Sequence, residues 1–136
     1  MALVLLAFVI QALMGASLLA TWWRRGRRDA PTVTVHWVAA VLGLVLWIAF
    51  VATDSLVAAW GSFAAITVGN TYGDKMLLAR VHHQTGTTSK RRNYPVVVVS
   101  IFRGRMPWRV AFHALFAGVV YFGCLGVCVA STVRAS

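Results

Sequence analysis

The sequence predicts an all-α integral membrane protein built as a bundle of four antiparallel membrane-spanning helices. Apolar residues make up 60% of the 136 positions and charged residues only 12%, and the mean hydropathy is +0.75. A soluble domain of this size carries about twice that share of charged residues. Four apolar stretches reach the length of about 20 residues that a helix needs to cross a bilayer. The basic residues are concentrated between those stretches.

The four stretches are expected to be helical because an open strand in lipid leaves its backbone groups unpaired. The first two contain no charged residue. The third is apolar as far as Gly69 and polar after it, and the fourth contains only Arg109, at its start. We expect one membrane domain over residues 1–136, with spans at about 2–23, 31–53, 56–79 and 108–133.

The connections between the stretches support this arrangement. Only Thr53, Asp54 and Ser55 separate the second stretch from the third, which forces an antiparallel hairpin. Segment 80–107 is expected to form a basic cytoplasmic loop. It includes the apolar run 94–102, which is too short to span. β-branched residues favour a strand there, but an interfacial, re-entrant or partner-bound segment fits the sequence equally well.

Basic residues predict the orientation. Twelve of the thirteen Lys and Arg lie in segments 24–28 and 75–109, and the remaining one is Arg134. Basic loops stay in the cytoplasm, so both termini are expected outside. No charge precedes the first apolar run, unlike in a secretory signal. Basic clusters beside spans bind anionic lipid headgroups at the cytoplasmic face. A nucleic-acid partner is not expected, because aromatic residues do not alternate with the basic ones.

Small residues recur at every fourth position of the third stretch, which places them on one helix face. Such a face allows another backbone to approach closely. It therefore predicts either packing within the bundle or an interface with a second copy or another membrane subunit. The residues are Gly61, Ala65, Gly69 and Gly73.

Two histidines occupy matching positions near the starts of the second and fourth stretches. His36 follows Pro31, and His113 follows Pro107. This faint repeat suggests two similar hairpins in parallel orientation.

Asp74 is expected at a depth similar to that of His36 and His113. Placing an ionisable group within a span costs free energy, so each such residue is expected to have a partner or a function. The two histidines suggest haem b ligation between facing helices. With Asp74 they suggest a metal or proton site, and the same layer suits an anionic headgroup or quinone. Alternatively, each group bonds only to a neighbour. Elsewhere, Gln11 is expected to hydrogen-bond across helices, and Cys124 and Cys128 to be small buried residues.

The stretch from His36 to Phe50, followed by Thr53 and Asp54, resembles small uncharacterised four-helix membrane proteins of high-GC Gram-positive bacteria. The excess of arginine over lysine, eleven to two, fits that source. The resemblance implies the fold and a bacterial plasma membrane, but no activity. The polar end of the third stretch, 69–74, departs from the pattern.

These observations together predict a small accessory or anchor subunit of a larger membrane complex, for which a respiratory complex is the candidate. We expect no catalytic activity of its own. In the sharper form, His36 and His113 hold haem b for electron transport. The alternative is a small homodimeric transporter or channel that uses Asp74.

Overall fold

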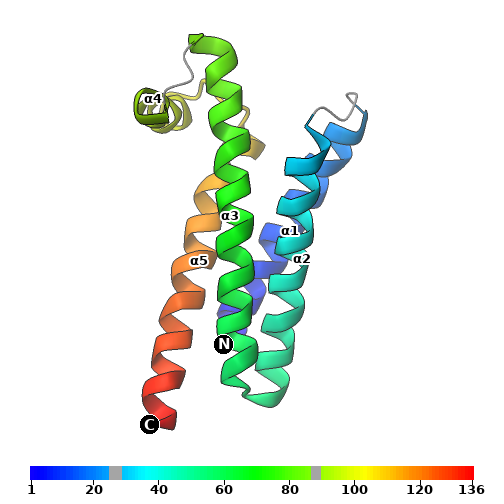
Figure 1. Ribbon diagram of the computed structural model, residues 1–136, viewed down its shortest axis with the longest axis vertical. Coiled ribbons are helices and arrows are strands. Elements are labelled where there is room, and N and C mark those ends of the chain that lie inside the picture. The colour runs from blue at the N-terminus through cyan, green and yellow to red at the C-terminus, as the bar shows by residue number, and fades with distance from the viewer. Residues whose placement is uncertain (25–28, 87–89) are drawn as a thin grey trace.

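The computed structural model of the chain describes residues 1–24, 29–86 and 90–136, with side chains described except at 83–85 and 90–93. These residues form helices and no strand, so the all-α prediction is confirmed for this part of the chain. Figure 1 labels five helices: α1 (Ala2–Arg24), α2 (Ala30–Thr53), α3 (Leu56–Thr85), α4 (Lys90–Phe102) and α5 (Trp108–Ala135).

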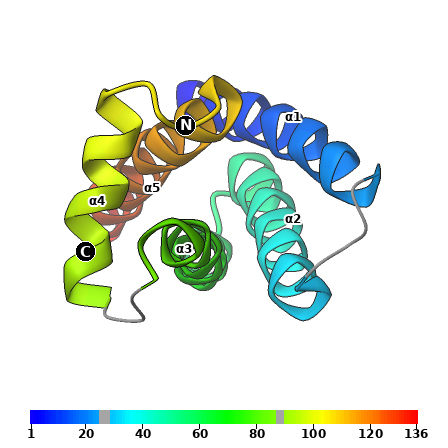
Figure 2. The same ribbon diagram turned by 90° about the horizontal axis from the view of Figure 1, so that it is seen from above.

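The four long helices form an antiparallel bundle, and α4 lies outside it. Viewed from above, α1, α2, α3 and α5 follow one another around the bundle (Figure 2). α3 contacts α2 and α5, α1 contacts the same two helices, and α4 contacts α3. Both termini and the α2–α3 turn lie toward one end (Figure 1). The end of α1 and the start of α5 lie toward the other, which we call the basic end.

The turn between α2 and α3 is as short as the sequence predicts. Asp54 adopts the left-handed conformation, with φ 53°, and its N–H donates to the Phe50 carbonyl over 2.8 Å. Aspartate tolerates this conformation better than most residues. The next residue, Ser55, caps α3 by accepting from the Ala58 N–H over 3.4 Å. One helix therefore stops and the next begins within two residues.

Three helices, not four, are long and apolar enough to cross a membrane: α1, α2 and α5. The prediction that 56–79 is a fourth stretch of this kind was wrong within the described residues. Asn70, Asp74 and Lys75 dilute the apolar character of α3 in its second half. Its first half is rich in small residues because it packs against other helices, where Ala59 and Ser62 are fully buried.

The run 94–102, whose conformation the sequence left open, belongs to helix α4. The preference of β-branched residues for strands is overridden because no neighbouring strand exists among the described residues to pair with it. One side of α4 packs on the bundle, where Val97 and Ser100 are buried.

The interior is small and aromatic, and most of the apolar surface faces outward. Trp47 and Phe50 are fully buried, and the Phe8 ring stacks on Trp47 with centroids 5.6 Å apart. Cys124 and Cys128 are free and fully buried, as predicted. Many large apolar side chains on the outside are exposed, including Leu3, Leu13, Val45, Val57, Val119 and Phe122. Exposed apolar surface of this extent marks contact with lipid or partners, which is compatible with a multi-pass membrane protein.

The small-residue face of α3 is turned toward α2. A β-carbon on Gly69 would lie 3.6 Å from that of Ala39, and one on Gly61 would lie 3.4 Å from Leu46. The Ser62 hydroxyl donates to the Gly43 carbonyl over 2.7 Å in the buried contact between the two helices. The stripe therefore serves packing inside the bundle.

Candidate functional site

His36 of α2 and His113 of α5 come together between the helices of the bundle. Their ring centroids are 6.1 Å apart and their ring planes make an angle of 77°. Both residues are half-buried. Two histidines separated by 77 positions in the sequence thus form one pair in space.

Two residues of α3, four positions apart, hold the His36 ring. Its Nδ1 lies 2.8 Å from the Gly69 carbonyl oxygen. A carbonyl only accepts, so the neutral ring carries its proton on Nδ1 and donates it, and Nε2 keeps a lone pair. Gly73 lies beside the same ring, where a β-carbon would be 3.2 Å from Cε1 of His36. The absence of a side chain at Gly73 makes the room that the imidazole occupies.

His113 is held in a similar way by two residues of α1, again four positions apart. The Gln11 amide donates from Nε2 to the His113 backbone carbonyl over 2.9 Å, which confirms the predicted interhelical hydrogen bond. A β-carbon on Gly15 would lie 3.2 Å from Cε1 of His113. Each histidine therefore contacts a neighbouring helix at two residues. One is a glycine beside the ring, and the other, one turn earlier in that helix, makes a hydrogen bond with the histidine.

Polar atoms without partners gather in this layer. Among the described side chains, buried nitrogen or oxygen atoms that lack a hydrogen-bond partner include His113 Nδ1 and Gln11 Oε1. Burying such an atom unsatisfied costs about 1–3 kcal/mol. His113 Nδ1 and Gln11 Oε1, on two residues that are hydrogen-bonded to each other, are therefore available to a bound group or a water molecule.

Asp74 does not join the histidine pair. It is exposed, and its Oδ2 accepts a hydrogen bond from the Tyr94 hydroxyl of α4 over 2.9 Å. This hydrogen bond raises the pKa of Tyr94, with smaller contributions from partial burial and from the negative charge of Asp74. Within the described residues, no group of three His, Cys, Asp or Glu is placed to hold a metal ion.

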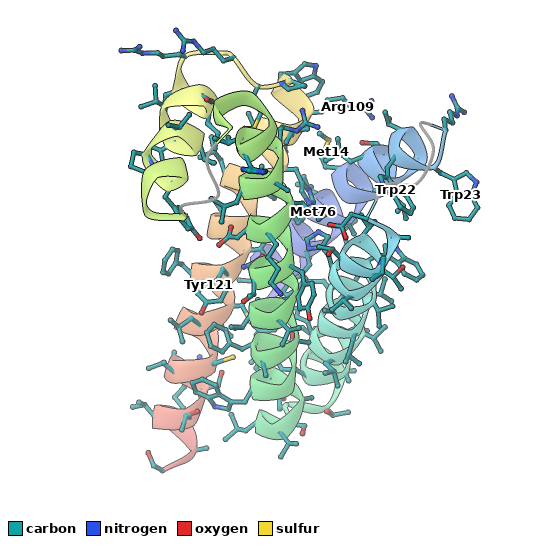
Figure 3. All side chains as sticks on the ribbon, turned by 45° about the horizontal axis from the view of Figure 1, so that its top comes forward. Met14, Trp22, Trp23, Met76, Arg109 and Tyr121 are labelled. Atoms are coloured by element: carbon teal, nitrogen blue, oxygen red, sulfur yellow. The ribbon has the colours of Figure 1, made fainter. Side chains whose placement is uncertain are left out.

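Two residues that contact the candidate site residues were missed by sequence reasoning, Gly15 beside His113 and Tyr94 beside Asp74. Gly15 carried a signal, because it follows Gln11 by four positions just as Gly73 follows Gly69. Tyr94 carried none, because the conformation of its segment was open. Figure 3 also places Met14, Met76 and Arg109 toward the basic end. Arg109 lies one helical turn before His113.

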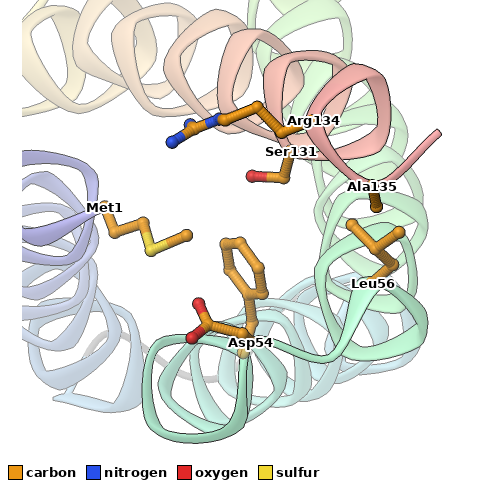
Figure 4. Close-up of a pocket in the computed structure, with 7 residues that line it drawn as sticks. Met1, Asp54, Leu56, Ser131, Arg134 and Ala135 are labelled. Atoms are coloured by element: carbon orange, nitrogen blue, oxygen red, sulfur yellow. The ribbon is translucent and has the colours of Figure 1, made fainter.

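A hollow of about 220 Å³ lies at the end of the bundle away from the histidine pair, beside both termini. Its wall combines apolar side chains with the acidic Asp54 and the basic Arg134, which come from different helix ends (Figure 4). The Ser131 hydroxyl of this wall is buried without a hydrogen-bond partner. The lining residues are Met1, Phe50, Asp54, Leu56, Ser131, Arg134 and Ala135.

Comparison of this chain with protein-family models, with curated proteins and with solved structures finds no match.

Proposed function

We propose that this chain is a multi-pass protein of a bacterial plasma membrane with both termini outside. Three helices with the length and apolarity of membrane spans support this placement. We further propose that α3 crosses with them as an inner helix, because it contacts both α2 and α5 and runs antiparallel to them. The excess of Lys and Arg at the basic end supports a cytoplasmic location for that end.

Within the membrane, the chain acts as an accessory subunit of a larger respiratory complex and has no catalytic activity of its own. The support is the distribution of apolar side chains over its surface. Exposed apolar side chains cover α1, α2 and α5, which suits contact with lipid and with other membrane subunits. The His36–His113 pair is the group of side chains in the interior that suits a bound cofactor.

His36 and His113 are proposed to hold haem b, and the observation that carries this proposal is their 6.1 Å separation. Imidazole is a usual ligand of haem iron, and two histidines on facing helices of a bundle are the side chains that would hold it here. The Nδ1 hydrogen bond of His36 fits as well, because a metal-binding histidine commonly donates its other N–H to a backbone carbonyl. Haem bound here would supply one-electron transfer.

The surrounding residues have separable roles in this proposal. The Gly69 carbonyl fixes the orientation and tautomer of His36. Gly15 and Gly73 leave the space in which the two rings lie. Gln11 ties α1 to the backbone of α5 at His113, so the position of the second ring depends on α1.

The alternative of a homodimeric transporter or channel that uses Asp74 draws no support from this geometry. The carboxylate of Asp74 is exposed and bonded to Tyr94 of α4, away from the histidine pair. Moreover, the small-residue face that a homodimer was expected to use is occupied by α2.

A reduced-minus-oxidised absorption spectrum of the protein, purified from cells that make haem, tests the cofactor. We expect a haem b band in the wild type that is lost in His36→Ala and in His113→Ala. His82→Ala is the matched control, because His82 lies outside the pair, and it should keep the band. A colourless wild type that also fails to bind added haemin would refute the haem proposal.

Purification in mild detergent tests the accessory role separately. Migration of the chain with larger membrane subunits, in a fixed ratio to them, is the expected result. A homodimer that conducts ions when placed alone in liposomes would overturn it.

A further inference from the structure

Helix α4 lies crosswise to the bundle at its basic end. In Figure 1 α4 is seen end-on while α3 runs along the vertical axis. In Figure 2 α3 is seen end-on and α4 is seen along its length. Because α3 runs along the bundle, an α4 perpendicular to it lies parallel to the plane of any membrane that the bundle crosses. It contacts α3 and lies beside the bundle, not inside it.

The outward face of α4 is apolar. Val97 and Ser100 are buried against the bundle, whereas Val98 is 49% exposed and Phe102 is 76% exposed. Tyr94, Val98 and Phe102 follow one another at intervals of four, so they form one line along the helix. A helix that meets water on its outer face would carry polar residues there.

Positive charge flanks this apolar face at both ends. The sequence places Lys90, Arg91 and Arg92 in the first turn of α4, and Arg103 and Arg105 follow its last residue. Arg103 and Arg105 are exposed. Binding of a helix to the interface of an anionic membrane grows with the apolar area that it buries and with the electrostatic attraction of nearby cations to the lipid headgroups. Each Lys or Arg near such a surface contributes about 1 kcal/mol.

Exposed tryptophans also occur on other helices at this end of the bundle. Trp108, at the start of α5, is 69% exposed, and Trp23, at the end of α1, is exposed too. Tryptophan and tyrosine gather at the boundary between lipid and water. Tyr94 takes part in both features, because its ring is exposed and its hydroxyl ties α4 to Asp74 of α3.

We propose that α4 lies flat in the membrane interface at the basic end, with Val98 and Phe102 inserted at the acyl-chain boundary and Arg103 and Arg105 on anionic phospholipid headgroups. The Tyr94–Asp74 hydrogen bond holds the helix at this depth and orientation. This proposal rests on the membrane placement proposed above and adds a specific lipid-binding element to it.

The test uses the full chain with Cys124 and Cys128 replaced by alanine, and a spin label on one introduced cysteine. Val98→Cys reports the outward face of α4, Val97→Cys reports its buried face, and Val45→Cys reports the lipid-facing side of α2. Each variant is placed in vesicles of phosphatidylcholine, with and without phosphatidylglycerol. Collision with oxygen, which enriches in lipid, is compared with collision with a water-soluble nickel complex.

The expected result is that the Val98 label meets oxygen and is shielded from nickel when phosphatidylglycerol is present, while the Val97 label meets neither. Replacing Arg103 and Arg105 with glutamine should abolish the part of this shielding that depends on phosphatidylglycerol. A Val98 label open to nickel in both vesicles overturns the proposal, and so does shielding that is equal with and without the anionic lipid.

The Val45 label separates the two levels of the account. If Val45 is in lipid while Val98 is in water, the interfacial role of α4 fails and the membrane placement stands. If Val45 itself is open to nickel, the membrane placement fails. If Val98 is shielded only when another protein is added, α4 is a protein-docking helix and the lipid proposal is wrong.

Discussion

Gly43 of α2 lies so close to Ile66 of α3 that a β-carbon at residue 43 would be 2.6 Å from the Ile66 Cγ2. Real β-carbons do not come this close to another atom, so a side chain at residue 43 would push the two helices apart or displace Ile66. Ile66 is itself buried and has little space to move. The α2–α3 contact therefore depends on glycine at this position.

Replacing Gly43 with alanine should destabilise the protein by about 1–3 kcal/mol, the usual cost of overpacking a close contact. Thermal unfolding in detergent measures the change. Gly118→Ala is the matched control, because no atom lies within 4 Å of a β-carbon there. That control should unfold at or slightly above the wild-type temperature, since alanine favours the helix. Equal unfolding temperatures for the two variants would contradict the close approach of α2 and α3.

Alanine at Gly73 or Gly15 should each disturb one histidine. A β-carbon on Gly73 reaches 3.2 Å from His36 Cε1, and one on Gly15 reaches the same distance from His113 Cε1. In NMR spectra, the Cε1 proton of His36 should therefore shift most in Gly73→Ala, and that of His113 most in Gly15→Ala. A reversed assignment, or no shift beyond that of Gly118→Ala, would show that the rings lie elsewhere.

The phenol of Tyr94 should ionise at higher pH than the ordinary tyrosine pKa of about 10. The hydrogen bond to Asp74 stabilises the protonated phenol, so its contribution to stability is present below the ordinary pKa. The contribution is lost as the pH rises through the raised value. Ultraviolet titration of tyrosinate should show the highest transition moving down in Asp74→Asn. Tyr94→Phe should remove that transition, and its persistence would show that another tyrosine is responsible.

Labelling with a membrane-impermeant maleimide tests the orientation. Ser136→Cys lies at the end of the bundle that carries the termini, and Ala30→Cys lies at the basic end, where the residue is exposed at the start of α2. In intact cells we expect only the cysteine at 136 to react, and the one at 30 to react after permeabilisation. The opposite pattern would mean that the basic end faces outward.

Much of the architecture could be predicted because it depends on features that are local in sequence. Apolar length predicts α1, α2 and α5, and the three residues 53–55 predict the hairpin. The polarity of α3 was harder to interpret. Whether Asn70 and Asp74 face lipid, water or protein depends on which helices surround them, and that information is not local.

The candidate site likewise has a part that could be predicted from sequence position and a part that could not. Similar depths of His36 and His113 made their meeting a reasonable expectation, and the structure pairs them. Asp74 was expected at the same depth, but it follows Gly73 by one residue and so points about 100° away around the helix. Depth is readable from sequence position, whereas the rotation of α3 is decided by its packing on α2. The small-residue stripe likewise defined a face of α3 without identifying its partner.

The spin state of the ferric protein reports directly whether both His36 and His113 bind the iron. Electron paramagnetic resonance of the wild type after haem loading should give a low-spin signal typical of two imidazole ligands, and either His36→Ala or His113→Ala should convert it to a high-spin signal or lose the haem. A high-spin wild type, or a low-spin signal unchanged in both variants, would contradict the account.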